Sequence, residues 1–304
     1  MIFGISRTSA IILALLLGAL FPAAQAWSGA LRWLIMVMLF PVFLEFTWSR
    51  ESLQRSHGWL LLANIGMSFA GWALGGLIGG REVALAGFFA GLTPTASAAP
   101  VVMSFLGGQV GYVITGFILT NLVIAGLSPL LLPLVLSSAT DISPAHVLGS
   151  VTLVVFVPLL SARLVRWLVP AAAVWPGKIR NVSFLMWMLA ILLVSANASH
   201  FLHSQGELPL GQLGGIVLVS GVVCAANFAL GALIGRPRFT REASQTLGQK
   251  NTAFTIYLAM THASPLAALG PTFYVIWHNL WNSWQLHRVA RKTGSDLAAG
   301  RESR

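Results

Sequence analysis

Residues 91–100 read Gly-Leu-Thr-Pro-Thr-Ala-Ser-Ala-Ala-Pro, and they lie in the middle of an apolar run at about 83–105. Pro94 and Pro100 each remove a backbone donor and clash with the preceding helical turn, so a helix through this run is expected to break. Inside a bilayer the freed polar groups cost several kcal/mol unless protein, water or ligand satisfies them. The segment therefore predicts a broken membrane helix. Its candidate substrate-binding residues are the hydroxyl side chains Thr93, Thr95 and Ser97.

The composition of the whole chain places this break in a membrane protein. The 304 residues are 56% hydrophobic and 9% charged, with a mean hydropathy of +0.80. A soluble domain carries roughly 25% charged residues because its surface meets water. Lipid is therefore the expected main solvent and partner of this chain, and a soluble fold of this size is excluded.

Ten apolar runs are long enough to span a bilayer, which takes about 20 residues. They lie at about 9–26, 29–47, 58–80, 83–105, 110–136, 144–165, 181–201, 211–235, 242–262 and 267–287. The predicted fold class is an all-α polytopic membrane protein of ten transmembrane helices. The first run also resembles a cleavable secretory signal, because Arg7 precedes an apolar core that ends in Ala24-Gln25-Ala26.

The placement of the basic residues predicts the orientation. The net charge of +10 arises from short clusters between the apolar runs, not from one helical face, so we expect no nucleic-acid partner. The connections on one side and the tail carry Arg50, Arg55, Arg163, Arg166, Lys178, Arg180, Arg236, Arg238, Arg241, Arg288, Arg291, Lys292, Arg301 and Arg304. The other side has only Arg32 and Arg81. The positive-inside rule then predicts an inner (cell) membrane protein with both termini in the cytoplasm.

A second interruption lies in the ninth run, where residues 246–252 read Thr-Leu-Gly-Gln-Lys-Asn-Thr. The two interruptions are the fourth of the first five runs and the fourth of the second five. Five is odd, so the halves 1–140 and 141–292 would be inverted repeats, followed by a polar tail at 293–304. Paired broken helices in inverted halves indicate a transporter site at the bilayer midplane. The alternative is a simple proline kink and a polar patch that holds helices together.

Four segments resemble the bile acid:sodium symporter family. They are residues 93–102 with the following Gly107-Gly108, the Ser-Pro-Leu-Leu-Leu-Pro of 128–133, the Gly-Gln-Lys-Asn-Thr of 248–252, and the Trp-His-Asn of 277–279. Their order and spacing fit a match over the whole chain. The resemblance implies two inverted five-helix repeats, with a panel of helices one, two, six and seven against a core built on crossing broken helices four and nine. It also implies sodium-coupled uptake of a small organic anion, bound by Asn251, Thr252, His278 and Asn279 together with the hydroxyls of the fourth run.

Two positions depart from the family pattern. Sodium-coupled members that this chain resembles carry a Glu two residues before the Gly of the ninth-helix motif and a Gln two residues after it. Thr246 and Lys250 stand there instead, and the third run lacks the family's Gln at 64–69. An ammonium about 4 Å from a sodium ion repels it by about 4 kcal/mol at an effective dielectric constant near 20. We therefore expect Lys250 to replace at least one sodium ion.

Lys250 then has two possible roles. Lysine at the centre of a span costs about 2.5–3.5 kcal/mol on insertion scales, so a functional role is the default. A lysine removed from water releases its proton more readily and could couple transport to protons. Alternatively the ammonium stays charged and pairs with a substrate carboxylate. Glu242 lies about two turns earlier on the same helix, which is too far for a direct pair.

Other classes of function fit less well. A conventional sodium:organic anion symporter is the main alternative. An intramembrane enzyme would need paired carboxylates or a His/Glu metal motif, and a channel would need a filter motif or charged rings. Cys224 is the single cysteine, so no disulfide framework and no cysteine metal site is expected. No cofactor is expected beyond sodium or a proton as the coupling ion. The substrate and the oligomeric state are left open.

Overall fold

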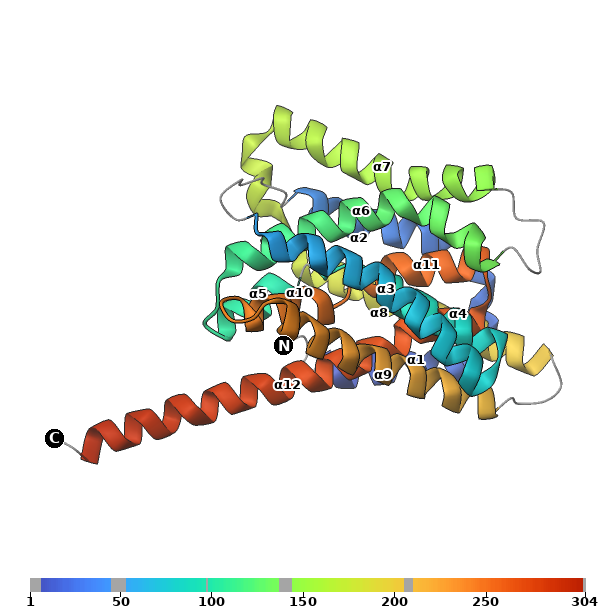
Figure 1. The fold of residues 1–304 in the computed structure, drawn as a ribbon. Helices are drawn as coiled ribbons and strands as arrows, with labels where there is room; N and C mark the ends of the chain where they lie inside the picture. The colour runs from blue at the N-terminus through green and yellow to red at the C-terminus, as the bar shows by residue number, and fades with distance from the viewer. Residues whose placement is uncertain (1–6, 45–52, 97, 137–143, 205–209, 303–304) are drawn as a thin grey trace.

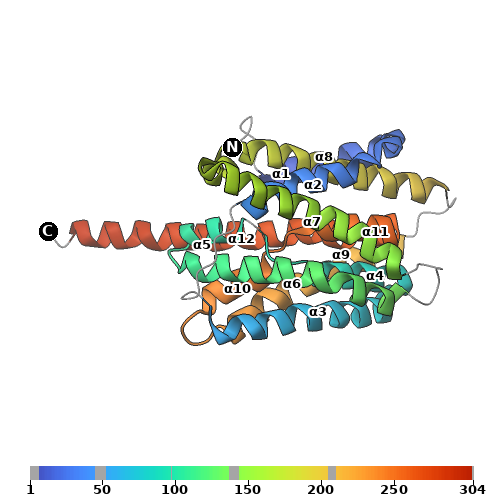
Figure 2. The ribbon, with the colours of Figure 1, turned by 90° about the horizontal axis from the view of Figure 1, so that it is seen from above.

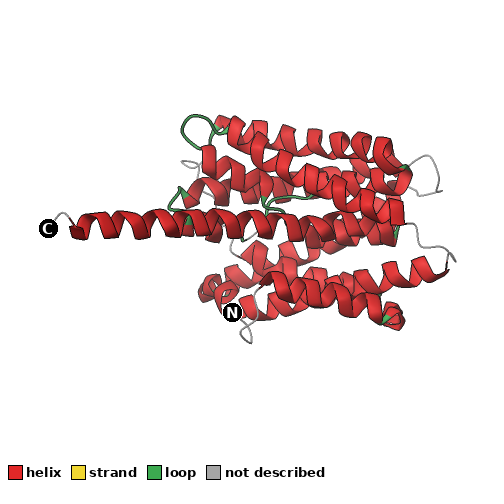
Figure 3. Cartoon of the chain, turned by 90° about the horizontal axis from the view of Figure 1, so that it is seen from below, coloured by secondary structure: helices red, strands yellow, loops and turns green. Residues whose placement is uncertain are grey.

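The computed structural model describes residues 7–44, 53–96, 98–136, 144–204 and 210–302. Within these ranges the chain is helical, and its one β contact is an isolated bridge (Figures 1 and 3). The elements up to residue 136 are α1 (Arg7–Leu20), the 3-10 helix η1 (Pro22–Trp27), α2 (Ala30–Leu44), α3 (Arg55–Gly79), α4 (Arg81–Leu92), α5 (Ala99–Phe105) and α6 (Val110–Leu136). The later elements are α7 (Pro144–Leu168), the 3-10 helix η3 (Pro170–Val174), α8 (Trp175–Ser204), α9 (Leu210–Ile234), α10 (Thr240–Gly248), α11 (Thr252–His262) and α12 (Pro265–Glu302).

Three of the described helices, α3, α6 and α9, are long and apolar enough to cross a membrane. They match the predicted runs at 58–80, 110–136 and 211–235 closely. A shorter apolar stretch, Met188–His200, lies in α8. The apolar helices indicate a membrane protein. The predicted fourth and ninth runs are each divided in two: α4 is followed by α5, and α10 by α11.

The helices form two layers (Figure 2). One layer holds α1, α2, α7 and α8, in which α2 contacts both α7 and α8 and α1 lies along α8. The other layer holds α3–α6 and α9–α12 (Figure 2). The largest apolar cluster joins the layers, because it combines Ile35 and Leu44 of α2 with Phe88 of α4 and Phe254 of α11.

Two tightly packed helix pairs precede the interruptions. α3 packs against α4, and α9 packs against α10. A Cβ at Gly71 of α3 would lie 2.5 Å from the carbonyl oxygen of Gly87 in α4, and a Cβ at Gly231 of α9 would lie 2.5 Å from that of Ala243 in α10. Only glycine permits these approaches, so the backbone of each helix that leads into an interruption is backed closely by its predecessor.

α12 is the longest helix, with 38 residues. It includes the predicted tenth run and continues through most of the predicted polar tail, and it projects well beyond the bundle (Figure 1).

Candidate functional site

The two interrupted helices meet at their breaks. Residues 93–96 after α4 and residues 249–251 after α10 form an antiparallel bridge between Thr95 and Lys250. The backbone N–H of Ala96 donates to the carbonyl oxygen of Gln249 at 2.8 Å, and that of Asn251 donates to the carbonyl oxygen of Pro94 at 2.8 Å. Each break therefore satisfies backbone groups that the other leaves unpaired, as burial in an apolar medium requires. We call residues 93–96 and 249–251 the crossing.

The Lys250 side chain is buried, with 2% of its surface exposed. Its ammonium donates to the side-chain oxygen of Asn64 in α3, and it lies 3.4 Å from the carbonyl oxygen of Gly91 in α4. The amide of Asn64 in turn donates to the carbonyl oxygen of Leu92 at 3.1 Å, in the last turn of α4. Both recorded partners of the ammonium are neutral oxygens, and none of the described residues supplies it with a carboxylate.

Thr246 and Glu242 lie in α10 but do not contact the ammonium directly. The Thr246 hydroxyl donates to the carbonyl oxygen of Glu242 at 2.8 Å, within its own helix. The Glu242 carboxylate accepts from the backbone N–H of Gln109 at 2.9 Å, just before α6. This acidic group is thus held at the far end of α10 from Lys250, in agreement with the expected separation. Thr246 contributes to the crossing through its carbonyl oxygen, which accepts from the Thr95 hydroxyl at 2.5 Å.

Side chains of α6 brace the first break. The Thr120 hydroxyl lies 3.1 Å from the backbone nitrogen of Thr95 and 2.9 Å from its hydroxyl. The amide nitrogen of Asn121 donates to the carbonyl oxygen of Thr95 at 2.9 Å, and its oxygen lies 3.4 Å from the amide nitrogen of Asn251. Asn121 therefore links both breaks. Thr120 and Asn121 were not predicted as site residues, although two adjacent polar residues inside an apolar run were a usable signal.

Thr93 and Thr252 lie on the α11 side of the crossing. The Thr93 hydroxyl donates to the carbonyl oxygen of Phe89 at 2.7 Å and lies 2.7 Å from the Thr255 hydroxyl. The Thr252 hydroxyl and the side-chain oxygen of Gln249 are buried and have no recorded hydrogen-bond partner. These two atoms could receive a ligand donor. Ser97 lies outside the described residues.

Among the described residues, neither His278 nor Asn279 of α12 makes a hydrogen bond to the crossing, but their neighbour Tyr274 bonds to the end of α10. The Tyr274 hydroxyl donates to the carbonyl oxygen of Gly248 at 2.7 Å, at the end of α10. His278 lies edge-on against Tyr274 with ring centroids 5.8 Å apart, and its Nδ1 is buried without a partner. The Asn279 amide donates to the carbonyl oxygen of Val275 in its own helix at 2.8 Å. Tyr274, one turn before His278, was a missed residue.

The crossing thus presents a buried cation, neutral oxygens and unfilled hydrogen-bonding atoms. Among the described residues there is no group of three or more His, Cys, Asp or Glu side chains that could hold a metal ion. The arrangement can bind an anion or exchange a proton. No model of a known protein family matches the chain, and no curated protein matches it.

Proposed function

We propose that this chain is a secondary active transporter of a small organic anion that works by alternating access, with the Lys250 ammonium in the place of a sodium ion. One observation carries the proposal. Two interrupted helices meet at their breaks, and the cation buried there is held by an amide oxygen and a carbonyl oxygen. Neutral amide and carbonyl oxygens are also the ligands by which a protein would coordinate a sodium ion.

Electrostatics supports the exclusion of sodium from these oxygens. An ion that used the Asn64 and Gly91 oxygens would lie about 4 Å or less from the ammonium, where two unit charges repel by about 4 kcal/mol at an effective dielectric constant near 20. Half of that energy weakens ion binding by more than about tenfold. A charged Lys250 and a sodium ion therefore compete for one position.

The arrangement of helices supports alternating access. The proposed repeats are residues 1–140 and 141–292, which place the α4–α5 and α10–α11 interruptions fourth in each half and give ten spans with both termini in the cytoplasm. The separate layer of α1, α2, α7 and α8 offers a body against which the layer with the crossing can move (Figure 2). Movement of one bundle against another around a fixed site is how such repeats transport.

The surroundings of Lys250 explain why the transported species would be an anion. A buried charge needs compensation, and no described carboxylate supplies it. A substrate carboxylate would supply it directly, and loss of the proton from the ammonium would remove the need for it. The two roles of Lys250 therefore combine in one cycle, in which the loaded state is protonated and the empty state can release the proton.

Uptake into proteoliposomes tests the proposal. Counterflow of labelled pyruvate, pantoate and taurocholate first identifies a transported anion. Uptake of that anion is then measured with sodium replaced by choline, at several external pH values. We expect uptake to persist in choline and to respond to an imposed pH gradient. Strict dependence on sodium contradicts the replacement by Lys250, and counterflow of none of these three anions contradicts anion transport.

A further inference from the structure

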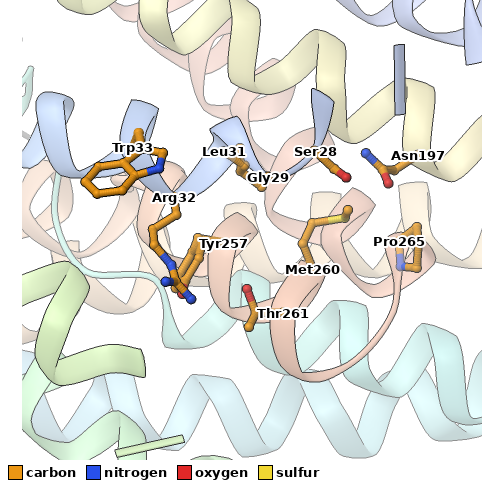
Figure 4. A pocket seen from close by; sticks show the side chains of 10 residues that line it. All are labelled: Ser28, Gly29, Leu31, Arg32, Trp33, Asn197, Tyr257, Met260, Thr261 and Pro265. Carbon is orange, nitrogen blue, oxygen red and sulfur yellow. The ribbon is translucent and has the colours of Figure 1, made fainter. Parts of the chain in front are cut away.

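A pocket of about 520 Å³ lies away from the crossing, between the two layers. Its walls are the connection from α1 to α2 with the start of α2, the last third of α8, and the second half of α11 with the start of α12. The lining residues include Ser28, Arg32, Asn197, Tyr257, Thr261 and Pro265 (Figure 4). Pockets that bind small molecules are usually about 300–1,000 Å³ and combine apolar walls with a few polar groups. The volume and the lining therefore suit one small organic molecule.

Two polar groups of this pocket lack partners. The Tyr257 side chain is buried with 3% of its surface exposed, and its hydroxyl has no recorded hydrogen-bond partner. Arg32 is exposed, and the structure records no hydrogen bond or ion pair for its guanidinium among the described residues. Figure 4 shows both side chains at the same end of the pocket. A buried hydroxyl without a partner costs about 1–3 kcal/mol, which a ligand acceptor would relieve.

We propose that this pocket binds the carboxylate of a small organic anion, with the Arg32 guanidinium and the Tyr257 hydroxyl as donors to its oxygens. Guanidinium and carboxylate pair in a planar, two-pronged geometry, and a charge-assisted bond from a phenol adds direction. Among the described residues that line the pocket there is no acidic side chain to pair with the arginine.

α11 connects this pocket with the crossing. The helix begins at Thr252 beside the crossing and ends at His262 beside the pocket, a length of about 16 Å. The connection from α1 to α2 and the turn from α11 to α12 are on the same side in the proposed ten-span topology, opposite the basic clusters. The pocket is then an outer binding site, which substrate that enters from outside reaches before the crossing. This assignment of side rests on the proposed function, whereas carboxylate binding itself does not.

Chemical labelling of a single thiol tests the pocket without any transport assay. Cys224 is the single cysteine and is buried, so the native chain gives the background rate. Thr261→Cys places an accessible thiol in the lining, because Thr261 is exposed. The purified full chain in phosphatidylcholine nanodiscs is labelled with an anionic and with a cationic methanethiosulfonate, and the ratio of the two rates measures the local potential. Pyruvate or pantoate is then added as a competitor.

We expect Arg32→Gln to lower the anionic-to-cationic rate ratio at least about fivefold. Arg81→Gln, a change at the other arginine of the same predicted side, is expected to leave the ratio within about twofold. A carboxylate should slow the labelling of Thr261→Cys when Arg32 and Tyr257 are intact, and adding Tyr257→Phe should weaken that protection by about tenfold.

Each remaining outcome has a defined meaning. Equal effects of Arg32→Gln and Arg81→Gln, or no protection by any carboxylate up to about 10 mM, a millimolar limit of weak binding, would overturn the proposal. Protection by phosphatidylglycerol in the nanodisc but by no free carboxylate would also overturn it, since the anion would then be a lipid headgroup. Protection without counterflow would retain this pocket and contradict the proposed function, and the reverse would retain the function and remove the pocket.

Discussion

The two breaks that meet at the crossing are made in different ways. After α4, Pro94 ends the helix through its own chemistry, and the break carries hydroxyl groups and no charge. After α10 there is no proline, and the break carries an amide, an ammonium and a second amide in residues 249–251. The carbonyl oxygen of Gly248 is occupied by Tyr274, and that of Gln249 by the backbone of Ala96. Tertiary contacts therefore interrupt the second helix, whereas local sequence interrupts the first.

Because of this difference, the two breaks contribute different chemical groups to the crossing. The first break and its preceding helix supply neutral groups, namely the Gly91 carbonyl and the Thr95 hydroxyl. The second break supplies the cation. Each is braced by the long helix that follows it: the first by Thr120 and Asn121 of α6, the second by Tyr274 of α12. Similar architecture on the two sides thus carries unlike chemistry, and the charged side chain belongs to only one of them.

The largest expected effect comes from removing that charge. Lys250→Met keeps the aliphatic stem, and we expect counterflow to fall at least about 100-fold, while thermal stability in detergent is unchanged or higher because a costly buried charge is lost. Equal amounts of reconstituted protein make the comparison. Lys292→Met, on the projecting part of α12, is the control. Retention of more than half of the native counterflow by Lys250→Met would show that the second break does not carry the essential charge.

The next effect tests whether the two helix pairs before the breaks are equivalent. A Cβ at Gly91 would lie 2.4 Å from the carbonyl oxygen of Met67, and one at Gly231 would lie 2.5 Å from that of Ala243. We expect Gly91→Ala and Gly231→Ala each to destabilise by about 1–3 kcal/mol, seen as a lower midpoint of thermal unfolding. Gly76→Ala is the control, because its Cβ would meet only the Ala84 side chain at 3.8 Å. A loss at one site alone would break the equivalence.

Smaller effects are expected from single hydroxyls. Thr95→Val removes the bonds to Thr246 and Thr120, and Tyr274→Phe removes the bond to Gly248. Each lost buried hydrogen bond is worth about 0.5–1.5 kcal/mol, so both variants should unfold at lower temperature and Thr95→Val should cost more. Thr115→Val removes only a hydrogen bond within α6 and serves as the control. A larger loss of stability in Tyr274→Phe would show that the second break depends more on its hydrogen bond from α12 than the first break depends on its bonds to α6.

The smallest effect is expected at Asn279. Its amide donates only within α12, so Asn279→Ala should change stability by less than about 0.5 kcal/mol and counterflow by less than about twofold. Abolished counterflow would mean that substrate reaches this residue in another state of the cycle. The two breaks alone would then not account for substrate binding, because α12 would contribute to it as well.

The sequence predicted the parts of the fold that depend on local chemistry. Apolar length located Val110–Leu136 closely, and the prolines predicted the end of α4. The pairing of Thr95 with Lys250 was not predictable in the same way, because its two members are far apart in the chain and neither carries a signal for the other. Tyr274 and Asn64 were not predicted as site residues for the same reason: their hydrogen bonds are made between helices, and only the packed structure brings the partners together. The position of Thr246 beside an ion stays a prediction; its hydroxyl donates within α10, to the carbonyl oxygen of Glu242.

The length of α12 has a consequence for observing the protein at work. Its residue Tyr274 is bonded to the end of α10, whereas its far end stands clear of the bundle (Figure 1). From Tyr274 to Glu302 the helix is about 42 Å long, so a tilt of about 10° at the tyrosine would displace the tip by about 7 Å. The protruding rod is a lever arm that amplifies small rotations of the buried helix. A spin or fluorescent label near its tip would report them from outside the bundle.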